Sequence, residues 1–359
     1  MKGVKERILV LSRESGRDYH IPGLEGGRTC PHLDFHLVDL QTDEIYLYHP
    51  PSLLQYAVPS SMVAVDDFIY VFGGTRPIFE SESNELNSLQ PLYHKEVFFG
   101  GARLHLSFDP SKTEDWYPAP VPTVNCNYPR CISLMDKIYV FGSVKLEPEV
   151  LDPAVGHWEQ LFLPSNLVGC TISSYALPDP SNHRIFLELS GGQLPSPTIY
   201  AFTPKDGSSG GHWEPIPFDA QDWTLNPIVG PDWTDVAAVV DNVIYFHSRK
   251  FPSILRAFDL ASGAWLIVRW ESRFDDGVDM NQRKIHFDAM FPLGNKMLCL
   301  AVWTQIFDYP HIANTSVKAE IVFRKFRVEQ SGATVKLFPL PSRSFILPAT
   351  SQVVNFLPV

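Results

Sequence analysis

The sequence predicts an all-β protein, a six-bladed β-propeller of four-stranded antiparallel blades that forms a single domain over residues 1–359. Three observations predict it. A unit of two apolar strands around a tight turn recurs along the chain, each unit is followed by a second strand pair that often ends in a Trp, and the two chain ends supply complementary halves of one unit. A single unit cannot bury its apolar faces without neighbours, so the repeats predict one closed domain.

The first half of the repeat is clearest at residues 60–74, where two strands rich in β-branched and aromatic residues flank the turn Asp66-Asp67. Gly73-Gly74 follows because the chain has to bend where a Cβ would clash. Complete copies of this half lie at residues 60–74, 131–143, 171–192, 235–248 and 288–300.

The second half of the repeat is a strand that ends in Phe-Asp or Val-Asp, then a short turn and a strand that often carries Trp. It occurs at residues 38–46, 108–116, 151–158, 200–213 and 258–265, with a degenerate copy at 326–337. Aromatic residues recur at equivalent places in the two halves, and we expect them to pack between adjacent blades: Tyr70, Tyr139, Tyr245, Trp116, Trp158, Trp213 and Trp265.

The two ends of the chain complete each other. The N-terminus offers only a second strand, residues 8–12, and the C-terminus offers only a first strand, residues 351–356. Unless these strands pair, both end blades expose unpaired edges. The sequence therefore predicts that the C-terminal strand closes the N-terminal blade.

The apolar strand followed by Gly73-Gly74 or Gly191-Gly192, together with the spaced Tyr and Trp residues, resembles the kelch repeat family in its plant-type, degenerate form. The resemblance covers essentially the whole chain. Two copies have Gly142-Ser143 and His247-Ser248 in place of the di-glycine, and the copies at the two ends of the chain lack it. The repeat averages ~60 residues, against ~50 in the kelch class. The resemblance implies four-stranded blades around a central channel.

The bulk composition limits the partners. A net charge of −11, from 29 basic and 40 acidic residues, argues against nucleic acid or an anionic membrane as the main partner. No apolar run reaches the length of a signal or transmembrane segment. The five cysteines are scattered without metal-ligand spacing, which indicates free thiols in a reducing compartment. We therefore expect a monomer in the cytoplasm, with the nucleus as the alternative.

The connections between strands differ between the two faces. In an antiparallel blade the turns joining strands 1 to 2 and 3 to 4 lie on one face, and they are mostly short here. The other face carries long connections at residues 13–31, 75–99, 118–128, 218–231, 271–284 and 305–316. Long loops of this kind are usually functional. The sequence therefore predicts a binding scaffold that presents these loops to a protein partner.

A second class of function is predicted at the channel mouth. Innermost strands of different blades start at this face, so their first residues converge on one axis. The polar and aromatic residues at or just before these starts are Arg130, Trp233, Asp235, His286 and Asp288. They would offer charge pairing, proton transfer and a flat apolar surface to a small-molecule ligand. An ion pair that plugs the channel explains the same residues. The alternative function is therefore a small-molecule enzyme, of the specifier, lyase or isomerase kind.

One loop carries an acidic triplet. Glu271, Asp275 and Asp279 follow one another at intervals of four residues. Plant specifier proteins, a kelch group that redirects glucosinolate breakdown using iron, carry Glu-x-x-x-Asp-x-x-x-His in such a loop. Glu271 and Asp275 match that motif, and Asp279 stands where the His would be. Fe(II) prefers an imidazole in its ligand set, and a solvated acidic loop explains the triplet equally well. We expect no cofactor, with a divalent metal such as iron as the alternative.

Overall fold

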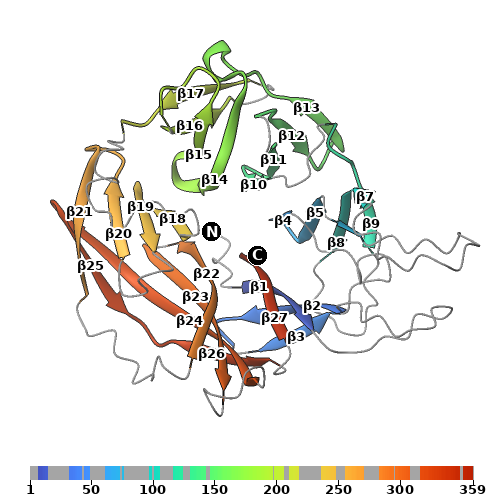
Figure 1. Ribbon diagram of the computed structural model, residues 1–359, viewed down its shortest axis with the longest axis vertical. Coiled ribbons are helices and arrows are strands. Elements are labelled where there is room, and N and C mark those ends of the chain that lie inside the picture. Colours follow the sequence, from blue (N-terminus) through green and yellow to red (C-terminus); the bar gives the residue numbers. More distant parts are fainter. Residues whose placement is uncertain are drawn as a thin grey trace, which may run out of the picture.

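The protein is built from β-strands grouped in sheets around a common centre (Figure 1). This computed structural model describes residues 7–14, 32–42, 44–48, 61–72, 75–76, 97–98, 101–105, 116–123, 130–142, 146–196, 198–205, 210–217, 236–247, 255–270, 283–294, 296–307, 316–347 and 351–358. Within these ranges the only helices are two short 3-10 turns, η1 (Ser165–Leu167) and η2 (Pro180–Asn182), and no helix is long and apolar enough to span a membrane. The all-β prediction is confirmed.

Within the described residues, four sheets have four antiparallel strands each, in the order expected of propeller blades. The first contains β27 (Ser351–Pro358), β1 (Arg7–Glu14), β2 (His32–Asp39) and β3 (Ile45–Tyr48). The second contains β4 (Ser61–Val65), β5 (Phe68–Phe72), β8 (Gly101–His105) and β9 (Trp116–Ala119), with β6 (Thr75–Arg76) and β7 (Val97–Phe98) as a separate pair. The third contains β10 (Arg130–Leu134), β11 (Lys137–Phe141), β12 (Glu149–Asp152) and β13 (His157–Gln160). The fourth contains β14 (Cys170–Asp179), β15 (Arg184–Gly191), β16 (Thr198–Pro204) and β17 (Gly211–Pro215).

The last part of the chain forms one nine-stranded sheet rather than two separate blades. Its first run is β18 (Val236–Val240), β19 (Val243–His247), β20 (Leu255–Asp259) and β21 (Ala264–Trp270). Its second run is β22 (Arg283–Gly294), β23 (Met297–Phe307), β24 (Ser316–Ser331) and β25 (Thr334–Pro339), with β26 (Arg343–Leu347) also paired to β24. The outer strands β21 and β25 join the two runs through parallel pairing. The count of six blades therefore stays a prediction.

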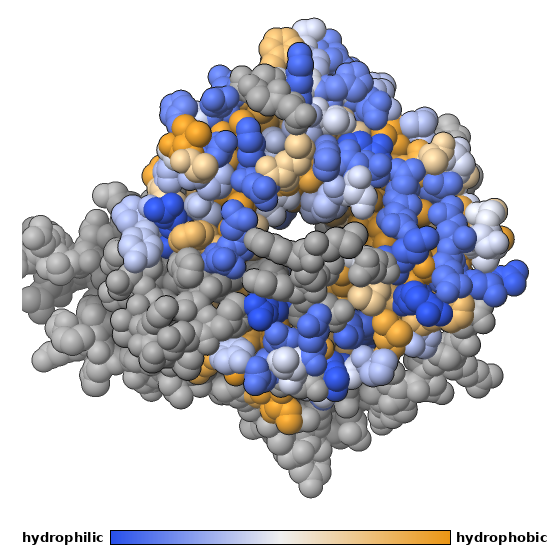
Figure 2. Space-filling view, turned by 180° about the vertical axis from the view of Figure 1, so that it is seen from behind, coloured by the Kyte–Doolittle hydropathy of each residue, from blue (hydrophilic) through white to orange (hydrophobic). Residues whose placement is uncertain are grey.

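The innermost strands form a closed ring. Strand β27 contacts β4, and the contacts continue through β10, β14, β18 and β22 back to β27. Figure 2, seen from behind, shows an opening near the centre of this ring. The pairing that closes the ring is the predicted one: β27 lies antiparallel to β1, with Val10 opposite Phe356 and Leu9 opposite Leu357. Strand β27 extends two residues beyond the predicted end, to Pro358.

The core is divided into clusters that lie between neighbouring sheets. On β1, Leu9 and Leu11 pack against Ile69 of the second sheet, whereas Ile8 and Val10 pack toward β22–β26. This follows from the two-residue period of a strand, which sends alternate side chains to opposite faces. Both faces of the inner strands are covered, so strands such as β5 and β11 are apolar at nearly every position instead of alternating.

The predicted inter-blade aromatics occupy these clusters. Tyr70 lies in the cluster between the second and third sheets, Tyr139 in the next, and Tyr245 between the two runs of the nine-stranded sheet. Trp158 is buried against Phe72 of the preceding sheet, with ring centroids 5.5 Å apart. The packing prediction is confirmed for these residues, and the side chain of Trp116 lies outside the described residues.

The Trp residues also link consecutive sheets by hydrogen bonds. The indole nitrogen of Trp158 donates to the carbonyl of Pro120 at 3.0 Å, and that of Trp213 donates to the carbonyl of Phe162 at 3.2 Å. In both cases the acceptor follows the fourth strand of the preceding sheet. Trp265 is only partly buried and packs at 5.3 Å from Phe258.

The di-glycine has the predicted conformational role where it is described. Gly191 and Gly192 both have positive φ, a conformation that L side chains rarely adopt. A Cβ on Gly192 would lie 2.9 Å from the Sγ of Cys170 and 3.0 Å from the carbonyl oxygen of Val168. The glycine therefore allows β15 to end against the start of β14.

The turn after β2 is held by a buried carboxylate. Asp39 accepts hydrogen bonds from the amides of Gln41 and Thr42, and Arg7 donates to it at 3.1 Å. Burial acts to raise the pKa of Asp39, but the two amides and the guanidinium outweigh it, so that the pKa lies below its usual value of 3.8. A lowered pKa contributes stability above the unfolded-state value and loses it as pH falls through the folded-state value.

We therefore expect Asp39→Asn to lower the free energy of unfolding at pH 7. The difference from wild type should shrink as the pH falls from about 3.8 through the lower pKa of the folded state, because Asp39 becomes protonated in both the folded and the unfolded protein only below both values. Urea unfolding at a series of pH values measures it. A difference that stays constant from pH 7 to pH 3 contradicts the role of the carboxylate charge.

Candidate functional site

One residue of the predicted channel mouth has a described side chain. Arg130 is exposed and is the first residue of β10. Beside it, the amide of Cys131 donates to the hydroxyl of Ser61 at 3.1 Å. Ser61 is the first residue of β4, so this bond joins the starts of two innermost strands. The starts of these two neighbouring strands therefore lie side by side, and the convergence of all five predicted residues stays a prediction.

The other four predicted residues are described less fully. His286 and Asp288 lie within β22, with only their backbone described, and β22 begins at Arg283, earlier than the predicted strand. His286 is the extra residue of a β-bulge, since Ile285 pairs with Thr304 and Phe287 with Trp303. Trp233 and Asp235 lie outside the described residues.

The predicted metal site also lies outside the residues that the structure describes. Glu271, Asp275 and Asp279 all lie between β21 and β22, in residues 271–282. Among the described ranges, no group of three His, Cys, Asp or Glu residues is placed to hold a metal ion. The metal hypothesis stays untested by the structure.

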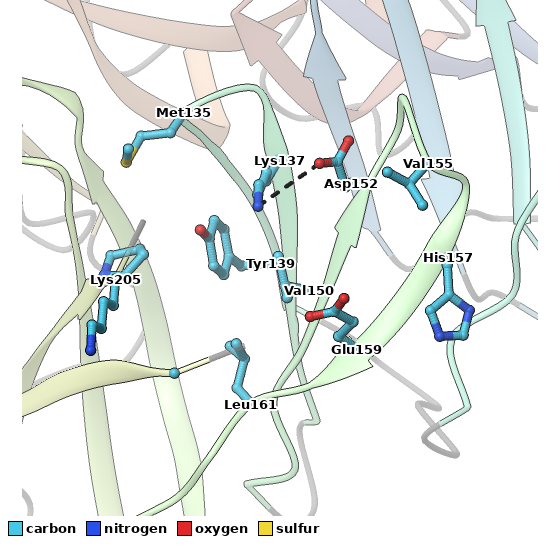
Figure 3. A pocket seen from close by; sticks show the side chains of 12 residues that line it. Met135, Lys137, Tyr139, Val150, Asp152, Val155, His157, Glu159, Leu161 and Lys205 are labelled. Carbon is cyan, nitrogen blue, oxygen red and sulfur yellow. Dashed lines mark ion pairs between the residues drawn. The ribbon is translucent and has the colours of Figure 1, made fainter. Parts of the chain in front are cut away.

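The structure shows a pocket that the sequence did not predict. It has a volume of about 300 Å³ and lies between the third sheet and the β16–β17 turn of the fourth (Figure 3). It opens beside the Met135-Asp136 and 153–156 turns, which join strands 1 to 2 and 3 to 4. The pocket is therefore at the short-turn end of the blades, opposite the predicted binding face.

Strand pairing builds the wall of this pocket in rows. Tyr139 of β11 pairs with Val150 of β12, which pairs with Glu159 of β13. One step nearer the turns, Asp152 pairs with His157. The paired residues share a sheet face, so one wall carries Tyr139, Val150, Asp152, His157 and Glu159 (Figure 3).

The base of the pocket is apolar and its rim is charged. Tyr139, Val150 and Leu161 are buried, and the Tyr139 ring meets Phe202 edge-on at 6.0 Å. At the rim, Lys137 lies 3.9 Å from Asp152 in a half-exposed ion pair. The carboxylate of Glu159 is exposed and makes no ion pair within the described part of the chain. The site can therefore hold a long side chain or small molecule with an apolar body and a charged end.

A second hollow continues the pocket along β13. The two share Leu161, Lys205 and Gly210, and the second adds Gln160 and Phe162. Together they form a groove between β13 and the start of β17. We refer to this as the β13 groove.

An equivalent pocket lies between the two runs of the nine-stranded sheet. Tyr245 takes the place of Tyr139 there, and Asp241 lies 3.5 Å from Lys296 at the rim. Burial, with smaller contributions from Asp241 and Asp259, raises the pKa of Tyr245 well above its usual range. Tyr245 is therefore neutral at physiological pH and packs as part of the core.

Comparisons with known proteins leave the family of this chain open. No protein-family model matches the sequence, and no curated protein matches it. Among solved structures, YjhT is similar with a TM-score of 0.48 and 10% identity, over 85% of this chain and 91% of that one. A protein of unknown function from Dyadobacter fermentans has a TM-score of 0.44 and 16% identity, over 85% and 90%. A nidogen/laminin complex has a TM-score of 0.41 and 10% identity, over 87% and 92%. Likeness at this level carries no argument about function.

Proposed function

We propose that this protein is a monomeric propeller of the plant-type kelch family and acts as a binding scaffold that presents the long connections of one face to a protein partner. The observation that carries the proposal is the unequal length of the connections on the two faces. Strands β4 and β5, β10 and β11, and β18 and β19 are each joined by two residues. At the other end of the strands, β1 and β2 are separated by residues 15–31, β17 and β18 by residues 216–235, and β21 and β22 by residues 271–282.

A rigid support with long loops on one side suits recognition. Each of these connections begins and ends at a strand that is paired within a sheet, so the ends of the loops are held at fixed positions. Loops on such a support form binding surfaces without changing the core. The acidic net charge of −11 favours a protein partner over nucleic acid. Cys131, Cys170 and Cys299 are free thiols, in keeping with a cytoplasmic or nuclear location.

The alternative, a small-molecule enzyme at the channel mouth, has a specific observation in its favour. Arg130 is exposed at the start of an innermost strand, next to the link between Ser61 and Cys131. The opening near the centre of the ring (Figure 2) leaves room for a ligand on the axis. A cation at such a site would bind an anionic group of a small substrate.

Replacement of a long connection tests the scaffold. We expect a variant with residues 77–96 replaced by a Gly-Ser linker to lose partner capture from extracts of cells that express the protein. Its thermal melt should stay unchanged, because the linker leaves every blade strand in place. Arg130→Ala serves as the comparison and should keep the partner. Capture that survives every replacement of a long connection contradicts the scaffold, and loss of metabolite turnover in Arg130→Ala favours the enzyme.

A further inference from the structure

We propose that the outer edge of β13 binds an extended peptide segment of a partner protein, which adds to the third sheet as a fifth strand and places a Lys or Arg side chain in the pocket of Figure 3. The surface is the β13 groove, at the short-turn end and rim of the blade. It lies apart from the face of the long connections, so it is a second binding surface and does not depend on the first.

The backbone of β13 has donors and acceptors on its outer side. Within the described part of the chain, β13 pairs only with β12. The amide of Leu161 donates to the carbonyl of Pro148 at 2.9 Å, so Leu161 faces β12. Backbone groups alternate along a strand, and therefore those of Trp158 and Gln160 face outward. An extended peptide can pair with these groups.

The protein itself shows that an outer edge of this kind accepts a strand. In the nine-stranded sheet, β21 holds the place that β13 holds in the third sheet. Its outer edge pairs with β25 in parallel, from Ile267 opposite Thr334 to Trp270 opposite Leu337. The amide of Ile267 donates to the carbonyl of Ala333 at 2.9 Å. Ile267 lies two residues after Trp265, as Gln160 lies two residues after Trp158.

The other two Trp-bearing outer strands have proline at this position. Pro118 follows Trp116 in β9, and Pro215 follows Trp213 in β17. Proline has no N–H to donate, and natural sheets use it to block edge pairing. Of the four Trp-bearing outer strands, two are blocked, β21 is paired, and β13 has Gln160. Among the Trp-bearing outer strands, and within the described residues, β13 is therefore the one whose outer edge is open to a further strand.

The walls of the groove suit an extended chain. The wall opposite β13 includes the backbone of Gly210 and Gly211, and a Cβ on Gly211 would meet the ring of Phe202. Val155 and Phe162, near the two ends of β13, are 73% and 71% exposed. Apolar side chains exposed near a strand edge provide contact area for a peptide that pairs with that edge.

The charges favour a basic side chain in the pocket. A peptide side chain that enters it meets the buried base of Tyr139, Val150 and Leu161, and then the carboxylate of Glu159 at the rim. Lys137 forms an ion pair with Asp152, and Lys205 lies on the opposite wall (Figure 3). A Lys or Arg side chain matches this arrangement, with its aliphatic stem on the base and its cation beside Glu159.

Two synthetic peptides test the proposal on the full-length protein. The first is acetyl-Thr-Val-Thr-Arg-Thr-Val-Thr-amide, and the second has Glu in place of Arg. We expect the Arg peptide to bind at least about tenfold more tightly than the Glu peptide, a difference of about 1.4 kcal/mol. The amides of Trp158 and Gln160 should exchange more slowly in its presence, measured by NMR hydrogen exchange.

Two variants separate the side-chain contact from the backbone contact. Glu159→Lys should reverse the preference between the peptides, whereas Glu214→Lys, which alters the residue after Trp213 in β17, should leave it unchanged. Gln160→Pro should weaken the binding of both peptides at least about tenfold, a loss of about 1.4 kcal/mol of binding free energy, since it removes an outward N–H group. Pro215 in β17 shows that the fold tolerates proline at this position.

Several results would overturn the proposal. They are failure of both peptides to bind at millimolar concentration, equal binding of the two peptides, or protection that maps to strands other than β13. Full binding by a folded Gln160→Pro variant would also overturn it. If that variant does not fold, the amide exchange of Trp158 and Gln160 in the wild-type protein decides the question.

Discussion

Deletion of residues 349–359 is expected to abolish soluble expression. The truncation removes β27, which pairs with β1 from Ile8 to Glu14. Ile8, Leu9 and Val10 are fully buried, and their removal from contact with β27 would expose an apolar strand edge. The deletion also breaks the ring, because β27 is the strand that contacts both β4 and β22. The soluble fraction after expression, measured by gel filtration, checks the prediction.

A shorter deletion is the control for this experiment. Removal of Val359 alone leaves all of β27 in place, including Phe356, which packs at 6.0 Å from Phe323. That variant should remain soluble. Full stability of the longer truncation would show that the protein does not depend on closure by its C-terminal strand.

Replacement of a Trp between sheets is expected to have the second large effect. Trp158→Ala should lower the free energy of unfolding by about 3–5 kcal/mol, the usual cost of removing a large buried aromatic side chain. It also removes the hydrogen bond to Pro120 and the edge contact with Phe72. Urea unfolding measures the loss.

Two further variants locate the origin of that loss. Trp158→Phe keeps an aromatic ring without the N–H group, so it should cost less than Trp158→Ala. Trp265→Ala should also cost less, because Trp265 is only partly buried. A thermal melt of Trp158→Ala that coincides with wild type would show that the residue is not part of the packing between sheets.

The sequence predicted most of the fold because the repeat carries local signals. Strands such as 68–72 and 137–141 combine β-branched and aromatic residues, and the turns before them have residues with positive φ, such as Asp66 and Asp136. Closure could be predicted because each chain end holds half a repeat. The parallel pairing of β21 with β25 could not be predicted, since no local sequence pattern indicates which distant strand pairs with an outer edge.

The candidate sites were predicted less well. Convergence of the innermost strand starts on one axis was predicted from symmetry and stays a prediction, and the bond between Cys131 and Ser61 joins two of these starts. The bulge at His286 depends on how β22 and β23 pair and has no sequence signal of its own. The β13 groove did have a signal: the residue two positions after each Trp is Pro118, Gln160, Pro215 or Ile267. Its meaning became clear only once the outer edges of these strands were known.

Hydrogen exchange of the native protein tests the central claim most directly, namely that the protein is a closed ring joined by its two ends. The amides that pair β27 with β1, around Val10 and Phe356, should exchange as slowly as those of the buried strand β11. The exchange rates of these amides should also depend on denaturant concentration in the same way as those of β11, because in a closed ring the two ends separate only on global unfolding. Fast exchange throughout residues 351–358, with β11 still protected, would contradict the closed ring.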